Sequence, residues 1–367
     1  MIKNKANIAG VCAVGAVWLT LSLWSAFKPA DAMSISERRQ LAAFPDVTAE
    51  SLLSGKFMTD FETYSLDQFP MRDEFRTLKA ITSFYLFGKK DNNDIYIADG
   101  YAAKIEYPLN KDSVTNAAGK FTYIYDKFLK DSASNIYLSI VPDKGYFLAD
   151  KYGYPSMDYS EMVQIMKDNM TYAEYIDIFP ELSINSYYKT DTHWRQEKIV
   201  SVAKKVSEAM GAAPLGDYTT AKTDVPFYGV YYGQSALPLD SESIYYVENP
   251  TLSGCTVTNV ETGKVYTGTN DFEKLNGKDP YEMYLSGACA VMYIDNPNAT
   301  TDKELVVFRD SFGSSLIPLL TEGYSRITIL DTRYIIPDLL GNFAEFENAD
   351  VLFLYSTSIL NQSSTLR

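Results

Sequence analysis

One histidine is present among the 367 residues, and its neighbours favour acid–base chemistry. His193 lies in the segment Thr190-Asp191-Thr192-His193-Trp194. Histidine is the side chain that most readily takes and returns a proton near neutral pH. Because residues i and i+2 of an extended segment point to the same side, the Asp191 carboxylate can accept a hydrogen bond from the imidazole. The pair predicts a general base, His193, that is oriented by Asp191.

Ser311 is the predicted nucleophile that this base would activate. It follows a run from Glu304 to Phe308 that predicts a buried strand, and it precedes a helix predicted from Ser314 to Thr321. Open α/β sheets bind ligands at the carboxyl ends of their strands, which is where such a serine lies. The N–H groups at a helix start lack partners, so the Ser311 backbone N–H is the main candidate to stabilise an oxyanion.

Each of these residues also has an ordinary structural interpretation. Asp191 could cap a helix beginning near Trp194, His193 could be a packed surface histidine, and Ser311 with Asp310 could be turn and cap residues. We favour the catalytic interpretation because the Asp-x-His pair and the strand–turn–helix serine occur together in one chain.

Four residues are weaker candidates for substrate binding. Lys144, Arg309 and Tyr334 could line a cleft, and Arg309 beside Asp310 could steer an anionic group, although charged residues at strand ends are usually solvated or paired. Tyr228 is one of several tyrosines in polar surroundings whose rings suit the faces of sugars, with ordinary strand packing as the alternative. This set comprises Tyr228, Tyr231, Tyr232, Tyr245 and Tyr246.

The composition restricts the class of protein. Hydrophobic residues make up 46 % and charged residues 22 %, which is typical of a globular chain with one large core or two modest ones. The net charge of −14, with no cluster of Lys and Arg, argues against nucleic acid as a partner. No set of Cys and His has metal-ligand spacing, so no metal is expected. Nucleophilic chemistry at a serine with a histidine base implies no organic cofactor either.

The N-terminus predicts export. Ile8 to Phe27 is uncharged, apolar and long enough to cross a bilayer, and the lysines before it predict an N-terminus inside and a body outside. We favour an uncleaved single-pass anchor in the cell membrane, with a cleaved signal peptide ending near Ala30-Asp31-Ala32 as the alternative. In an oxidising exterior Cys255 and Cys289 could form a disulfide or remain buried thiols, and the sequence leaves both open.

Strands that alternate with helices predict an α/β sandwich with a largely parallel sheet, and short alternating runs between Val225 and Pro297 predict a β-rich insertion. Helices are expected over 72–86, 116–130, 159–175, 196–210 and 314–321, a hairpin over 94–101, and strands over 135–142, 304–308, 327–330 and 351–355. The predicted domains are an anchor (1–33), an extension packing on the core (34–110), a first core part with Asp-x-His (111–224), the insertion (225–300) and a second core part with the serine (301–367).

Six segments carry a resemblance to a known family: Glu37 to Arg39 with Leu41, Asp67 to Arg72, Val141 to Lys144, Asp191 to Trp194, Phe227 to Gly229, and Arg309 to Phe312. Together they resemble the bacterial DHHW family and the related periplasmic proteins of alginate O-acetylation. The likeness spans nearly the whole chain after the anchor. Thr192 stands where the family name has its first His, and His193 matches the second.

This resemblance implies an SGNH hydrolase-like three-layer α/β/α sandwich in which the Asp-x-His pair precedes the serine. It implies Ser311 as nucleophile, His193 as general base, Asp191 as its orienting partner, and an acetyl-serine intermediate. The expected activity is O-acetyl transfer to, or acetyl-ester hydrolysis of, a cell-surface or secreted polysaccharide. The likeness to the alginate system further implies a membrane-bound O-acyltransferase as the partner that supplies acetyl groups.

A non-catalytic glycan-binding or assembly scaffold is the alternative function. The distance between the Ser311 hydroxyl and a ring nitrogen of His193 separates the two hypotheses. A distance within about 3.5 Å favours the enzyme. A separation beyond about 8 Å favours the scaffold, because no change of rotamer would close it.

Overall fold

The computed structural model describes residues 2–367, which divide into two compact units. The smaller unit contains the chain up to Asn93 together with Tyr232–Pro238. The larger unit contains Asp94–Tyr231 and Leu239–Arg367. All three predicted catalytic residues belong to the larger unit.

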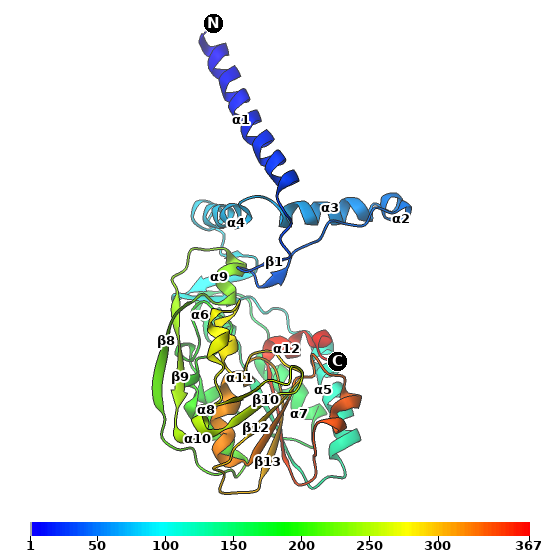
Figure 1. The fold of residues 1–367 in the computed structure, drawn as a ribbon, viewed down its shortest axis with the longest axis vertical. Helices are drawn as coiled ribbons and strands as arrows, with labels where there is room; N and C mark the ends of the chain where they lie inside the picture. Colours follow the sequence, from blue (N-terminus) through cyan, green and yellow to red (C-terminus); the bar gives the residue numbers. More distant parts are fainter. Residues whose placement is uncertain (1) are drawn as a thin grey trace. The chain divides into compact units, whose positions relative to one another are not determined.

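The larger unit is built on one eight-stranded sheet with the order β11-β10-β12-β14-β13-β15-β6-β7 (Figure 1). The strands from β14 to β7 are parallel, whereas β12, β10 and β11 continue the sheet antiparallel at one edge. Their bounds are β6 (Asn135–Val141), β7 (Glu174–Tyr175), β10 (Thr256–Asn259), β11 (Val265–Thr267), β12 (Val291–Asp295), β13 (Glu304–Arg309), β14 (Arg326–Leu330) and β15 (Asp350–Ser356).

The central strands are apolar on both faces because helices cover both sides of the sheet. Every residue of β15 is buried, as expected for a parallel strand inside a sandwich. In β13, Val306 and Phe308 pack into the cluster formed with α5 (Lys111–Ile124) and α7 (Tyr159–Asn169). The alternate residues Leu305 and Val307 pack into the cluster that contains α8 (Val200–Ala209) and α11 (Gly313–Leu316). These layers confirm the predicted α/β fold around a central sheet.

Some predicted elements differ from the structure at their ends. The helix predicted over 159–175 ends at Asn169, and residues 174–175 form β7 at the sheet edge. The helix predicted over 314–321 is α11 followed by a 3₁₀ helix, Ile317–Gly323. Pro318 explains this change, because its ring supplies no N–H to continue an α-helix. The segment predicted over 196–210 is a 3₁₀ turn (Gln196–Lys198) and then α8.

The predicted β-rich insertion contributes directly to the central sheet. Its strands β10, β11 and β12 extend the antiparallel edge. A separate antiparallel pair, β8 (Thr219–Phe227) with β9 (Glu242–Glu248), starts before the predicted boundary at residue 225. The remaining strands and α-helices of this unit are the hairpin β4 (Ile95–Ala98) with β5 (Tyr101–Lys104), the helices α6 (Gly145–Tyr152), α10 (Pro250–Gly254) and α12 (Thr357–Asn361), and α9 (Val230–Ser235), in which the division between the units falls.

The two cysteines outside α1 are both free and buried. Burial raises the pKa of the Cys255 thiol to about 11 and also raises that of Cys289. Of the two alternatives left open by the sequence, the structure therefore has the pair of buried thiols.

The smaller unit begins with α1 (Ile2–Phe27), in which Asn7–Phe27 has the length and composition of a membrane-spanning helix. The predicted helix over 72–86 is present as an α-helix, α4, followed by a π-helical segment. The other elements are β1 (Met33–Ser34), β2 (Arg39–Gln40), α2 (Ala49–Leu53), α3 (Lys56–Asp67), α4 (Arg72–Ile81), the π-helical segment Thr82–Leu86 and β3 (Asp91–Asn92).

Candidate active site

Ser311 lies in the tight turn between β13 and α11, at the carboxyl edge of the sheet. The connection after β13 packs on the α8 face, whereas α12, which follows the neighbouring β15, packs on the α5 face. Such a change of direction creates the crevice in which open α/β sheets bind ligands. The fold therefore places Ser311 at the crevice where a ligand is expected to bind.

Asp310 holds this turn in place. Its carboxylate is fully buried and accepts hydrogen bonds from the N–H of Phe312 at 2.9 Å and of Ser356 at 2.7 Å. The second bond joins the ends of β13 and β15. In the sequence Asp310 could only be described as a turn or cap residue, because its partner Ser356 lies in a distant segment.

The Asp191–His193 loop is attached to the serine turn through Trp194. The indole Nε1 of this buried residue donates to the carbonyl oxygen of Phe312 at 3.1 Å and to the Ser315 hydroxyl at 2.9 Å. A bridge between Tyr187 and Trp194 closes the base of the loop. The residue after the histidine thus contacts the residues after the serine, which brings the two distant segments together.

Asp191, His193 and Ser311 form a continuous hydrogen-bonded chain. His193 Nδ1 lies 2.6 Å from Asp191 Oδ1, and His193 Nε2 lies 2.7 Å from Ser311 Oγ. Asp191 is fully buried and also accepts the N–H of His193 at 3.0 Å and the N–H of Val230 at 2.8 Å. With the Nδ1 proton held by the carboxylate, Nε2 is the nitrogen that can accept the serine proton.

Tyr281 stacks on the imidazole and was not indicated by any sequence motif. The two rings lie 4.0 Å apart between centroids at an interplanar angle of 7°. The buried Tyr281 hydroxyl lies 2.8 Å from the Ser315 hydroxyl, and burial raises the pKa of Tyr281 well above its ordinary value. The neutral tyrosine therefore restricts rotation of His193.

Gly229 permits the close approach of another segment to the catalytic loop. A Cβ atom at this position would lie 2.3 Å from the backbone nitrogen of Asp191, and the Gly229 N–H donates to the Thr190 hydroxyl at 3.0 Å. Phe227 to Gly229 is one of the segments that resemble the DHHW family, and this close approach explains why it contains a glycine. The neighbouring Tyr228 is 45 % exposed, so its ring is accessible beside the loop.

Lys144 is buried beneath the Asp191–His193 loop, so it does not have the predicted position facing a substrate. Its ammonium group donates to the carbonyl oxygens of Tyr188 at 3.0 Å and Lys189 at 3.2 Å and lies 4.9 Å from the centre of the Tyr231 ring. Burial lowers the pKa of Lys144 to about 7, against the opposing charge of Asp191. Lys144 supports the start of the loop.

Arg309 is also fully buried, which differs from the predicted role of steering an anion. Its guanidinium donates to Ser314 Oγ at 2.9 Å, to the Gly287 carbonyl oxygen at 3.0 Å and to the Asp310 carbonyl oxygen at 3.3 Å. These partners all belong to the protein, so Arg309 shapes the serine turn. Tyr334, in contrast, is 48 % exposed after the end of β14.

The comparisons with known proteins agree with this fold. Residues 157–330, which include Asp191, His193 and Ser311, match the family model described as DHHW protein. A DHHW family protein from Eubacterium siraeum has a similar structure, with a TM-score of 0.61, 19 % identity, and coverage of 75 % of this chain and 94 % of that one. Bacillus cereus PatB1 with a sulfonyl adduct has a TM-score of 0.58, 18 % identity, and coverage of 72 % and 95 %.

The O-acetyltransferase domain of Pseudomonas putida AlgJ is a more distant neighbour, with a TM-score of 0.45, 11 % identity, and coverage of 73 % of this chain and 92 % of that one. No curated protein matches the chain. Residues 157–330 thus match the DHHW family model, and the resemblance predicted from the sequence is confirmed.

Proposed function

We propose that this protein is an extracytoplasmic, membrane-tethered O-acetyltransferase or acetylesterase that acts on a polysaccharide through an acetyl-serine intermediate. The observation that carries the proposal is the hydrogen-bonded chain from Asp191 through His193 to Ser311 at the carboxyl edge of the sheet. This geometry is what a hydroxyl nucleophile, its base and an orienting carboxylate require.

In the proposed reaction, Ser311 Oγ attacks an acetyl carbonyl while His193 Nε2 takes the hydroxyl proton. The imidazolium is stabilised by Asp191 and returns the proton to the leaving oxygen when the tetrahedral intermediate collapses. An acetyl ester of Ser311 remains. A sugar hydroxyl or a water molecule, deprotonated by His193, then attacks this ester and restores the free serine.

The proposed oxyanion donor is the backbone N–H of Ser311. Among the described residues it donates to no protein acceptor, whereas the next N–H, that of Phe312, is held by Asp310. A preorganised N–H near the developing negative charge lowers the barrier for acyl transfer. Tyr228 and Tyr334 are the proposed substrate contacts, since both rings are exposed. Tyr228 lies beside the Asp191–His193 loop, and Tyr334 follows the end of β14.

The polysaccharide and the acetyl source are proposed from the resemblance to the alginate system. In this proposal α1 is a single-pass anchor with its N-terminus inside, and the site lies outside the cell. Because acetyl groups are made in the cytoplasm, a membrane-bound O-acyltransferase would deliver them across the membrane. The scaffold alternative required a wide separation of Ser311 and His193 and is not favoured by a 2.7 Å contact.

The test is hydrolysis of a chromogenic acetyl ester by the full chain in detergent. We expect acetate release and a serine that is modified by a sulfonyl fluoride, a reagent suggested by the adduct recorded for PatB1. Ser311→Ala and His193→Ala should abolish both, whereas Ser201→Ala, at an exposed serine on α8, should change neither. Acetate release that persists in Ser311→Ala and His193→Ala would refute the site. Addition of acceptor oligosaccharides then distinguishes transfer from hydrolysis.

A further inference from the structure

The helices of the smaller unit leave their apolar side chains exposed. Across α2, α3, α4 and the π-helical segment, only Asp67 and Ala80 are buried. Leu53 is 90 % exposed and Leu86 73 %. We call the following residues the exposed apolar surface: Leu52, Leu53, Met58, Phe61, Leu66, Met71, Phe75, Leu78, Ile81, Tyr85, Leu86 and Phe87.

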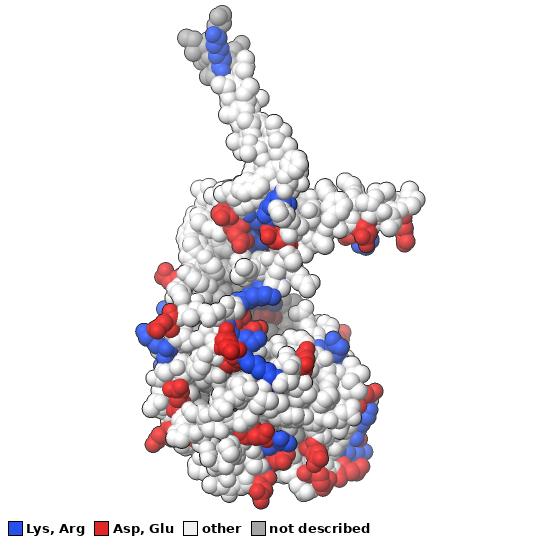
Figure 2. Space-filling view, in the orientation of Figure 1, with Lys and Arg blue, Asp and Glu red and all other residues white. Residues whose placement is uncertain are grey.

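The exposed aromatic and aliphatic residues of the larger unit differ in kind, because most of them are tyrosines, which carry a polar hydroxyl. Contiguous apolar surface on a protein marks a site of contact with a partner or a membrane. The charged side chains of the α2–α3 arm gather along one edge in Figure 2, and the opposite edge is uncharged in that view.

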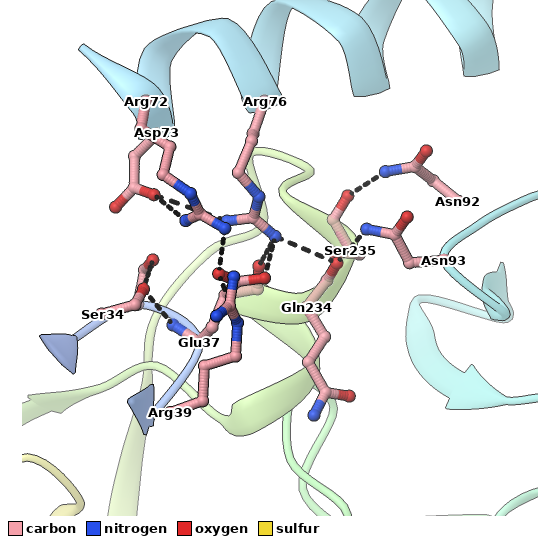
Figure 3. A network of polar contacts seen from close by, with 12 residues as sticks. Ser34, Glu37, Arg39, Arg72, Asp73, Arg76, Asn92, Asn93, Gln234 and Ser235 are labelled. Atoms are coloured by element: carbon pink, nitrogen blue, oxygen red, sulfur yellow. Dashed lines mark hydrogen bonds and ion pairs between the residues drawn. The ribbon is translucent and has the colours of Figure 1, made fainter. Parts of the chain in front are cut away.

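The polar face of α4 is the face that contacts the rest of the smaller unit. Arg72 and Arg76 both point from α4 toward Glu37 (Figure 3). Arg72 Nη2 lies 2.5 Å from Glu37 Oε2, and Arg76 Nη2 lies 3.0 Å from Glu37 Oε1. Arg76 also donates to the Gly233 carbonyl oxygen at 2.8 Å. Leu78 and Ile81 lie on the opposite side by helical spacing and are exposed. Most apolar residues of α4 therefore lie outward, the reverse of a helix at the surface of a soluble domain, and the exposed Glu74 lies on the same side one turn before Leu78.

The same inversion holds at the end of α3. Asp67 is buried and accepts hydrogen bonds from Arg39 at 2.5 Å and 2.8 Å and from the Ala42 N–H at 2.9 Å. The arginine holds the pKa of this carboxyl at about 2. Its neighbour Leu66 is 66 % exposed. The carboxylate of this ion pair is buried, whereas its Arg39 side chain is 42 % exposed. The end of α3 thus buries a charged group and exposes a leucine.

A short connection keeps these helices near α1. The Asp31 N–H donates to the side-chain oxygen of Gln68, and the Gln68 amide donates back to the Asp31 carbonyl, each at 2.8 Å. Asp31 follows Phe27, the last residue of α1, by a segment that spans at most about 14 Å when extended. The headgroup region of a bilayer extends about 5–8 Å beyond its hydrocarbon on each side. The end of α3 and the start of α4 therefore lie within reach of the membrane surface.

We propose that the exposed apolar surface is inserted into the boundary between headgroups and acyl chains of the membrane that α1 spans. Aromatic rings and leucines enter this boundary while basic residues stay at headgroup level, and here Tyr85, Leu86 and Phe87 are followed by Lys89 and Lys90. The proposal rests on the proposed anchoring role of α1. It adds that the smaller unit is a membrane-surface module whose lipid contact replaces a hydrophobic core.

The experiment uses the full chain reconstituted into vesicles of phosphatidylcholine and phosphatidylglycerol, with an environment-sensitive fluorophore on one cysteine. Cys255 and Cys289 are buried, so the natural reactive position is Cys12 in α1. The test variant combines Cys12→Ser with Leu78→Cys. The matched control combines Cys12→Ser with Val265→Cys, because Leu78 and Val265 are each 60 % exposed and Val265 belongs to the larger unit.

We expect spin-labelled lipids to quench the probe at residue 78 several-fold more than the probe at 265. The probe on natural Cys12 reports α1 independently. Quenching at Cys12 without quenching at 78 would overturn the membrane-surface proposal and leave the anchor intact. Absence of quenching at both positions would contradict the anchoring role of α1 as well. Burial of the probe at 78 that increases with the density of protein in the vesicles would assign the exposed apolar surface to contact with a second copy. Burial that occurs only in native membranes would assign it to contact with a membrane protein. Either result would overturn lipid insertion.

A further pair of variants guards against a local folding defect. In a chain with Cys12→Ser and Leu86→Cys, Leu78→Glu combined with Ile81→Glu should reduce the lipid quenching of the probe several-fold, because two carboxylates are expelled from the boundary. Lys79→Glu is the control, because Lys79 is exposed on the side of α4 that carries Arg72 and Arg76 and the change alters the net charge by the same amount. It should leave that quenching unchanged. Equal quenching in both variants would contradict the proposal.

Discussion

The two units of this protein bury different kinds of side chain. In the larger unit, apolar strands and helices form two cores on either side of the sheet, and the buried polar groups include Asp191, His193 and Asp310 at the carboxyl edge of the sheet. In the smaller unit the long helices bury a carboxylate, Asp67, and expose leucines and aromatic rings. Under the proposed function, the buried polar groups at this edge of the larger unit serve chemistry, whereas the buried carboxylate of the smaller unit holds its structure together.

The largest effect is expected from Ser311→Ala. If the polar cluster of the larger unit is there for chemistry, this variant should lose about 10⁶-fold in kcat, as removal of a serine nucleophile does elsewhere. Its melting temperature should change little, since one partly buried hydroxyl is removed. Esterase kinetics and thermal unfolding measure the two quantities. A large drop in melting temperature with activity retained would reverse the assignment of this cluster.

Asp191→Asn should cost about 10⁴-fold in kcat, because the amide no longer favours the tautomer in which Nε2 accepts the serine proton. The Val230 N–H retains an oxygen acceptor in this variant, so the loop should keep its conformation. The matched control is Asp177→Asn, at an exposed aspartate of the same unit. A loss of less than tenfold would indicate that Asp191 only fixes the loop.

Lys144→Met tests whether every buried polar group of the larger unit serves chemistry, because it removes a buried charge near the site without changing the reacting atoms. We expect roughly a tenfold loss of kcat, since the loop loses two hydrogen bonds. The pKa of Lys144 is about 7 in the folded protein and 10.5 when unfolded. The unfolded state therefore binds more protons between these values, so stability should rise with pH from about 7 to 9. This rise should disappear in Lys144→Met and remain in the exposed control Lys151→Met, as measured by melting temperature.

The smallest effect is expected from Asp67→Asn, which should leave ester hydrolysis unchanged. The pKa of Asp67 is lowered from 3.8 to about 2, so its contribution to stability is present above about 4 and is lost as the pH falls through about 2. Cleavage of the smaller unit by pepsin should therefore increase over this range in the unaltered protein. In Asp67→Asn cleavage should be fast throughout, whereas Asp60→Asn on the same helix should behave like the unaltered chain. Loss of ester hydrolysis in Asp67→Asn would contradict the division of roles.

The sequence was sufficient to predict the elements of the core and the segments that carry the site. The apolar runs of β6, β13, β14 and β15 and the amphipathic spacing of α5 are local patterns, and local patterns predict local structure. The surroundings of the site were not predictable in the same way. Tyr281, which stacks on His193, lies in a segment without a motif, and the burial of Lys144 and Arg309 depends on distant partners.

The sequence alone determined which residues could perform chemistry and which helices are amphipathic, because residue type and periodicity are properties of a short stretch of chain. Only the tertiary structure decided that His193 and Ser311, 118 positions apart, are in contact, since this depends on the packing of Trp194 against the turn after β13. It also decided which way α4 faces. Periodicity defines an apolar side and a polar side, but the ion pairs of Arg72 and Arg76 with Glu37 turn the polar side inward.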